Sequence, residues 1–181
     1  QIPTGAESEF RGIIDLVTMK ATVYKQDDGM EYDVVDVPAD LMDVAAQFRE
    51  QMIEAAADFD DSIMEKFLEG ETVDPNDIKL ALRAGTIAGK IIPVTCGSAY
   101  KNKGVQPLLD AVIELLPSPV DVDDTPGKDV DTLEPVTRKA ADDAPFSALA
   151  FKIVTDRFGT LTFIRVYSGT LNKGSSVLNA T

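Results

Sequence analysis

The stretch IIPVTCGSAYKNKGVQPLLDAVIELL, residues 91–116, decides the fold class. It opens with a short apolar run, 91–96, of the kind that forms a strand buried on both faces. A polar loop follows at 97–104. Apolar side chains then recur at helical spacing from Val105 to Leu116. A strand, a loop and a helix in this order are the building block of α/β folds, so we expect an α/β protein.

The residues before this unit predict a β-hairpin and three helices. Residues 10–24 and 30–37 are rich in β-branched and apolar side chains, and a turn at 27–29 separates them. Helices are expected at 39–58, at 63–68, and from an Asp74 N-cap and Pro75 to about Gly85.

The helix expected at 39–58 carries an acidic stripe. With successive residues about 100° apart, Asp43, Glu50 and Glu54 lie opposite the apolar face. That face consists of Leu41, Val44, Ala45, Phe48, Met52, Ala55 and Ala56, and Met42 and Ile53 lie beside it and would broaden it. Such a stripe is most often a solvated face. Its sharper interpretation is a docking face for a basic partner.

The residues after the unit change in character. Residues 117–145 contain five prolines and many acidic side chains, which predicts an extended, exposed linker. The remainder is β in pattern. We expect strands at 148–154 and 161–167, a turn at 159–160, and a hairpin turn at 172–174 that leads into a third strand at 176–178.

Composition excludes several functions. The 181 residues carry a net charge of −14, which disfavours general nucleic-acid binding. Residues 146–181 alone carry four basic side chains and one acid, so this tail could contact a phosphate backbone. The lack of histidine removes the commonest metal ligand and the usual catalytic triad. The single cysteine, Cys96, favours a reducing compartment such as the cytoplasm, and no apolar run is long enough to span a membrane.

Three short motifs carry little chemistry by themselves. Residues 124–127 fit an Asp-x-x-Gly pattern, but they lie in the linker and are interpreted as a plain turn. Residues 102–105 begin like the guanine-reading Asn-Lys-x-Asp motif, yet the fourth residue is Val105. Residues 96–100 offer a thiol and a hydroxyl without a histidine. They are interpreted as a strand end that feeds a loop where backbone N–H groups can approach a ligand.

Four stretches, in order, resemble bacterial elongation factor G, the translational GTPase that drives translocation on the ribosome. They are PTGAESEFRGIIDLVTMKA (3–21), PADLMDVAAQFREQMIEAAADFDDSIMEKFLEGE (38–71), VTCGSAYKNKGVQPLLDAVIELLPSPVDV (94–122) and PFSALAFKIVTDRFGTLTFIRVYSGTLNKGSSVLN (145–179). One departure is that Thr155 precedes Asp156-Arg157, where the family leads us to expect Asp-Pro.

The resemblance implies a partial phosphate-loop GTPase domain followed by the first strands of a translation-factor β-barrel. The subdomain inserted into the GTPase domain, with its flanking elements, would be residues 1–90. The last strand–helix unit of that domain would be 91–116, the linker 117–145, and the truncated second domain 146–181.

The resemblance also implies sites and partners. Ser98 and Ala99 match the pair that contacts the guanine base, the alanine through its backbone N–H. The inserted subdomain recruits the ribosomal stalk protein, for which Asp43, Glu50 and Glu54 are candidates chosen from the helical wheel. The barrel rests against small-subunit ribosomal RNA. No DNA and no membrane partner is expected.

In that family the phosphate loop, both switch segments and the Asn-Lys-x-Asp motif precede the residue that matches Gln1. The segment is therefore expected to be inactive alone, with no cofactor of its own, although the parent binds GTP, GDP and Mg²⁺. Two alternatives stay open. One is a non-catalytic module that docks to the stalk protein. The other is part of a related ribosome-binding GTPase, a ribosome protection protein or peptide-chain release factor three, which the long helical insertion at 39–85 disfavours.

Overall fold

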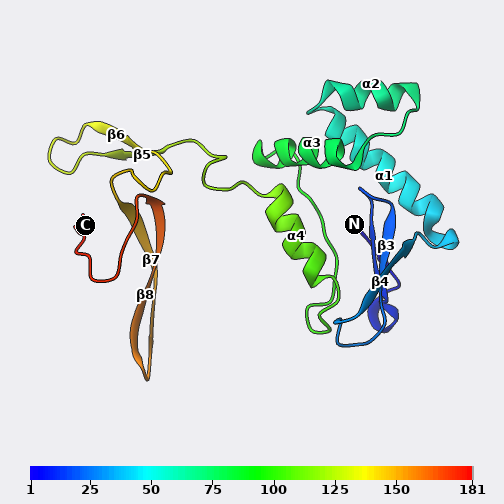
Figure 1. Ribbon diagram of the computed structural model, residues 1–181, viewed down its shortest axis with the longest axis horizontal. Coiled ribbons are helices and arrows are strands. Elements are labelled where there is room, and N and C mark those ends of the chain that lie inside the picture. The colour runs from blue at the N-terminus through cyan, green and yellow to red at the C-terminus, as the bar shows by residue number, and fades with distance from the viewer. Residues whose placement is uncertain (181) are drawn as a thin grey trace. The chain divides into compact units, whose positions relative to one another are not determined.

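The computed structural model describes residues 1–180, which form two compact units, 1–117 and the residues from Ser118 on. The first unit holds four strands and all four helices, and the second holds two hairpins (Figure 1). The expected mixture of α and β structure is confirmed. The sheets are antiparallel, and none of those within residues 1–180 closes into a barrel.

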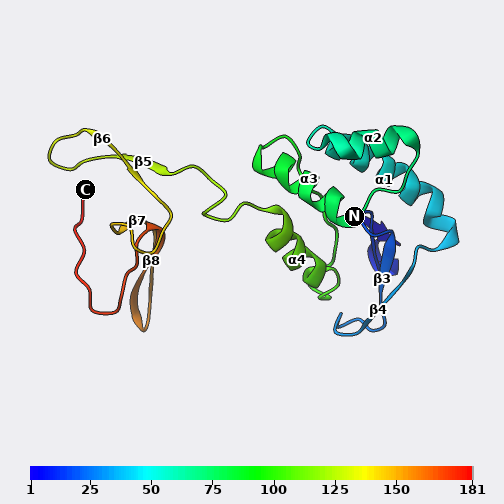
Figure 2. The same ribbon diagram turned by 45° about the horizontal axis from the view of Figure 1, so that its top comes forward.

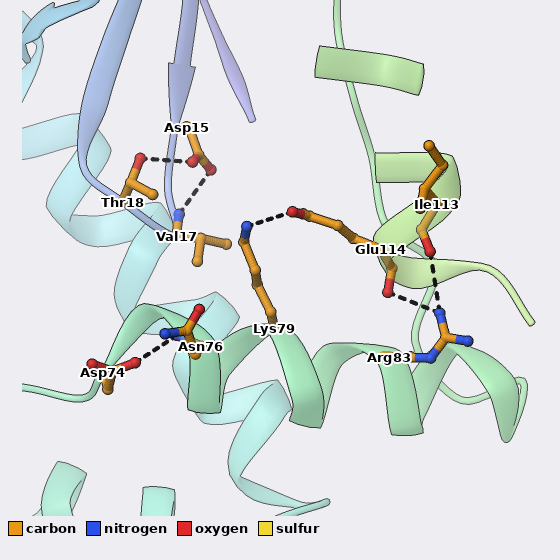
Figure 3. A network of polar contacts seen from close by, with 9 residues as sticks. All are labelled: Asp15, Val17, Thr18, Asp74, Asn76, Lys79, Arg83, Ile113 and Glu114. Carbon is orange, nitrogen blue, oxygen red and sulfur yellow. Dashed lines mark hydrogen bonds and ion pairs between the residues drawn. The ribbon is translucent and has the colours of Figure 1, made fainter. Parts of the chain in front are cut away.

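The sheet of the first unit is a meander of β1 (Ile2–Thr4), β2 (Gly12–Asp15), β3 (Lys20–Tyr24) and β4 (Tyr32–Asp36). The predicted hairpin is confirmed as β3 and β4, which pair from Lys20↔Asp36 to Tyr24↔Tyr32. The stretch 10–24 is two strands, because the Asp15 carboxylate closes a turn inside it. That carboxylate accepts hydrogen bonds from the Val17 N–H (3.0 Å) and the Thr18 hydroxyl (2.6 Å), as Figure 3 shows.

The helices follow their local signals closely. After a 3₁₀ turn at Ala39–Leu41 come α1 (Met42–Ala57), α2 (Asp61–Glu69), α3 (Pro75–Ile87) and α4 (Val105–Leu115). The Asp74 carboxylate accepts the Asn76 N–H at 2.8 Å and Pro75 occupies the first turn, so the predicted cap is confirmed. None of the helices within residues 1–180 is long and apolar enough to cross a lipid bilayer.

Helix α1 joins the sheet to the other helices. On one side Ile53 of α1 packs with Ile63 and Ile78 from α2 and α3, and on the other Ala45 packs with Ile14 of the sheet. Figure 2 shows α1 lying next to both α2 and α3. Ile53 is therefore buried and broadens the buried face of α1, as the helical spacing predicted.

One side chain of α1 fastens it directly to the sheet. The Arg49 guanidinium donates to the carbonyl oxygens of Leu16 and Val17, at the turn that follows β2. Burial lowers the pKa of Arg49 below its ordinary value, and the Asp15 charge opposes that shift. Phe48 differs from its predicted place: it is 45% exposed and does not pack into either core cluster.

The buried strand predicted at 91–96 is wrong for this chain. The run is extended but forms no strand, and Ile92 and Val94 are 85% and 71% exposed. A strand exists only through hydrogen bonds to a neighbouring strand. No strand within residues 1–180 pairs with this run, whose Val94 carbonyl accepts one hydrogen bond from the Gln1 amino group.

Polar contacts hold α4 against α3. The Lys79 ammonium lies 2.6 Å from the Glu114 carboxylate. Arg83 donates to the backbone carbonyls of Ile113 and Glu114, as Figure 3 shows, and to that of Leu116. Because the last carbonyls of a helix carry partial negative charge, a cation at this end stabilises α4.

The second unit holds two hairpins. One joins β5 (Thr125–Lys128) to β6 (Pro135–Arg138), and the other joins β7 (Ser147–Asp156) to β8 (Gly159–Ser168). The segment predicted to be an extended linker therefore contains a hairpin.

Three local predictions in the second unit are wrong. The plain turn predicted at 124–127 is largely strand β5, and the turn follows at Asp129, whose carboxylate accepts the N–H groups of Asp131 and Thr132. The β7–β8 turn lies at 157–158 and not at 159–160. Residues 173–174 form the expected turn, but 176–178 form no strand, because no partner strand lies beside them within the described part of the chain.

Candidate functional site

The loop that carries Ser98 and Ala99 is a small closed structure. The Ser98 N–H donates to the Lys103 carbonyl at 2.7 Å, and the Lys103 N–H returns to the Ser98 carbonyl at 3.0 Å. Gly97 and Gly104 close the ends, and a Cβ on Gly104 would lie 2.7 Å from the Cys96 carbonyl oxygen. The loop backbone is therefore held in one conformation. Ala99 lies exposed within it.

This loop rests on the β3–β4 turn, residues 25–31. The Tyr24 hydroxyl accepts the Gly104 N–H at 2.7 Å. The Asp27 carboxylate accepts hydrogen bonds from Lys103 (3.0 Å) and Lys101 (3.2 Å), which hold the pKa of Asp27 below its ordinary value. Burial raises the pKa of Tyr24, and the hydrogen bond from Gly104 opposes that rise. Sequence reasoning missed Tyr24 and Asp27, because nothing local links them to the loop.

A small pocket of about 410 Å³ lies beside the loop. Ser98 and Lys101 line it together with Glu7, which supplies a carboxylate. Toward a small polar ligand the Lys101 ammonium can donate hydrogen bonds, the Glu7 carboxylate can accept them, and the Ser98 hydroxyl can do both. No group of three potential metal-ligating side chains occurs within residues 1–180.

Cys96 ends the extended run beside this pocket and is half-buried. Burial raises the pKa of its thiol above the ordinary value. The thiolate, which is the reactive form, is therefore scarcer at a given pH than in an unfolded chain. We expect iodoacetamide to alkylate Cys96 more slowly in the folded chain than in urea at pH 8, and the difference to shrink as pH rises through the thiol pKa. Equal rates at pH 8 would contradict the shielding.

The acidic stripe lies where the helical wheel puts it. Asp43, Glu50 and Glu54 are all exposed on α1. None of the ion pairs found within residues 1–180 involves them. The structure does not bring this stripe together with Ser98 and Ala99, since the pocket beside the loop has no lining residue from α1.

A larger apolar cleft of about 740 Å³ was not predicted. Its walls come from β2, from α1 with Phe48 and Met52, from the extended run with Ile92, and from α4 with Leu115. The cleft explains why Phe48 is not packed into the core.

The basic side chains of the β7–β8 hairpin lie beside aromatic rings. The Arg157 guanidinium is 4.8 Å from the Phe158 ring centre, and Arg165 is 5.1 Å from that of Tyr167. Lys152 lies 6.0 Å from the Phe163 ring. Phe158 and Phe163 are exposed and Tyr167 is half-buried. Cations that lie over accessible rings are suited to contact with a nucleic acid.

Comparison with solved structures supports the observed fold, whereas comparison with protein families does not name one. No protein-family model matches the chain. A crystal structure of a protein from Thermus thermophilus is similar, with a TM-score of 0.68 and 26% sequence identity. The match covers 96% of this chain and 23% of that protein. This chain thus spans about a quarter of the length of the protein that it resembles in structure.

Proposed function

We propose that the chain is a segment of a translational GTPase similar to elongation factor G, whose parent hydrolyses GTP to promote ribosomal translocation. In that protein it would supply the inserted subdomain, the last strand–helix unit of the GTPase domain and the start of the β-barrel domain. The ordered resemblance of four stretches carries this proposal. The structural match to a much longer chain supports a place within a larger protein.

Ser98 and Ala99 would contact the guanine base of GTP or GDP. A guanine presents a carbonyl oxygen where adenine presents an amino group, so a backbone N–H at that point favours guanine. The closed loop, with Ala99 exposed, is the observation in support. The chain contains no phosphate loop, so Mg²⁺ and the phosphates would be held by other parts of the parent.

The test uses the longer gene product, in which a Gly-x-x-x-x-Gly-Lys-Ser/Thr sequence must precede the residues of this chain. Ala99→Pro removes the N–H, and Ala99→Gly keeps it. Loss of one such hydrogen bond should weaken GDP binding about tenfold in the proline variant alone. Absence of the phosphate loop, or equal GDP affinity of the two variants, would overturn the proposal.

A second candidate function is favoured by the exposed carboxylates on α1. The segment would dock to the ribosomal stalk protein, the partner that the resemblance implies, without any chemistry. Rim charges of this kind speed association and set specificity. This candidate needs no GTPase domain, so the isolated chain can test it.

We expect the stalk protein's C-terminal domain to shift NMR signals of residues 40–60, with weaker binding at higher salt. Glu50→Lys with Glu54→Lys should reduce affinity about tenfold or more. Glu65→Lys with Glu69→Lys is the matched control, because these carboxylates have the same spacing on α2 and are also exposed. No shifts at millimolar partner, or equal losses from both pairs, would exclude independent docking by this face.

The β7–β8 hairpin would contact small-subunit ribosomal RNA in the parent. The stacked arginines and the excess of basic side chains in 146–181 support this role. A ribosome protection protein or release factor three is less well supported as the parent, because helices α1 to α3 form the long insertion that we associate with elongation factor G.

A further inference from the structure

The backbone pair between Ser98 and Lys103 closes the loop 97–104 by itself. Further contacts join this loop to the β3–β4 turn. The geometry points to Tyr24 and Asp27 as positioning residues that fix the orientation of this loop, and with it the N–H of Ala99. That the loop is held for the sake of a bound base rests on the proposed function. The contacts themselves are independent of the proposed function.

Tyr24 holds the end of the loop. Its hydroxyl accepts the Gly104 N–H at 2.7 Å and donates to the Gln106 side-chain oxygen at 3.3 Å. The first of these contacts is buried. Since a buried backbone N–H requires a partner, a phenylalanine at 24 would leave Gly104 unsatisfied and loosen the loop where it enters α4.

Asp27 holds the middle of the loop. The Lys103 side chain is only 7% exposed, and its ammonium ends on the Asp27 carboxylate. The Lys101 ammonium reaches the same carboxylate oxygen at 3.2 Å. The Asp27 side chain itself is 80% exposed, so the pair ends at the surface while the stem of Lys103 is buried along the loop. Loss of the carboxylate would remove the contact that holds the Lys103 ammonium in this place and loosen the loop backbone.

Backbone contact leaves the loop no room to move toward the turn. Gly29 has φ +65°, and a Cβ there would lie 2.3 Å from the Asn102 carbonyl oxygen. The Gln106 amide also donates to the Gly29 carbonyl at 3.3 Å. The β3–β4 turn (25–31) and the loop 97–104 therefore form one rigid contact, here called the joint. Polar side chains surround a direct backbone contact at its centre.

Amide hydrogen exchange measured by NMR on this chain distinguishes positioning from general stability. Tyr24→Phe should speed exchange at the Ser98 and Lys103 amides by roughly fivefold to tenfold, the effect of one lost hydrogen bond on local opening. The amides of the β2–β3 ladder should keep their rates. Unchanged loop amides, or an equal rise in the β2–β3 ladder, would overturn the role of Tyr24.

Tyr32→Phe is the matched control. Tyr32 lies edge-to-face with Tyr24, with ring centres 5.6 Å apart, and none of the hydrogen bonds found within residues 1–180 uses its hydroxyl. We expect no change at Ser98 or Lys103. For the second residue, Asp27→Asn should speed exchange at Lys103, whereas Asp33→Asn, which breaks the pair with Lys25, should not. If Asp27→Asn and Asp33→Asn have the same effect on exchange at Lys103, Asp27 does not position the loop.

These measurements need no nucleotide, so their failure leaves the Ala99 test untouched. In the longer gene product, Tyr24→Phe should then weaken GDP binding by about threefold to tenfold, and Tyr32→Phe should leave it unchanged. Faster loop exchange with unchanged GDP affinity would show that the joint exists but does not serve a nucleotide.

Discussion

Replacement of Gly12 by alanine should strongly destabilise the sheet of the first unit. Gly12 is central in the meander, opposite Thr4 of β1 and Val23 of β3. A Cβ at this position would lie 1.9 Å from the Thr22 carbonyl oxygen, which is backbone and cannot swing aside. Relief of that overlap requires β2 and β3 to separate. We expect the free energy of unfolding to fall by about 3 kcal/mol or more.

Urea unfolding followed by circular dichroism would measure this effect. Gly89→Ala is the control, because Gly89 has open space around it and its substitution brings only the strain of φ +66°. That strain costs about 1 kcal/mol. If the two variants unfold at the same urea concentration, the close approach of β2 and β3 at Gly12 is not as described.

The second large effect is expected from Ile78→Ala. Ile78 on α3 is 0% exposed and packs in the cluster that unites α1, α2 and α3. Its truncation removes buried methyl groups and leaves a cavity between three helices, at a cost of about 3–4 kcal/mol. Because this cluster holds the helices together, loss of helical signal at a lower urea concentration is the expected readout.

Leu80→Ala provides the comparison on the same helix. Leu80 is 65% exposed, so its truncation should change the free energy of unfolding by less than about 0.5 kcal/mol. A loss from Leu80→Ala as large as that from Ile78→Ala would mean that this side chain is covered in solution, for example by a second copy of the chain.

The elements that sequence predicts best depend on contacts within a few residues. The start of α3 is an example, since Asp74 caps the chain two residues away and Pro75 fits the first turn. The acidic stripe of α1 is another, since helical spacing alone sets which carboxylates share a face. Neither feature needs knowledge of the rest of the fold.

The failures are features that depend on distant partners. The apolar run 91–96 has the composition of a buried strand, yet composition does not supply a strand to pair with it. Conversely, Thr125–Lys128 has the composition of a turn and becomes a strand because 135–138 lies opposite. The candidate loop was predicted from its own residues, but its support by Tyr24 comes from 80 residues away, where no spacing rule applies.

The joint between the β3–β4 turn and the loop has a consequence for how such a chain can vary. Residues 32–96, with β4 and the helices α1 to α3, leave from one side of this joint and return to the other. A segment whose two ends lie together can be lengthened, shortened or exchanged with little displacement of what lies on either side. Because β4 pairs with β3 and α1 packs on the sheet, the part of this excursion that could vary most freely is α2 with its flanking turns, while the anchored loop keeps its place.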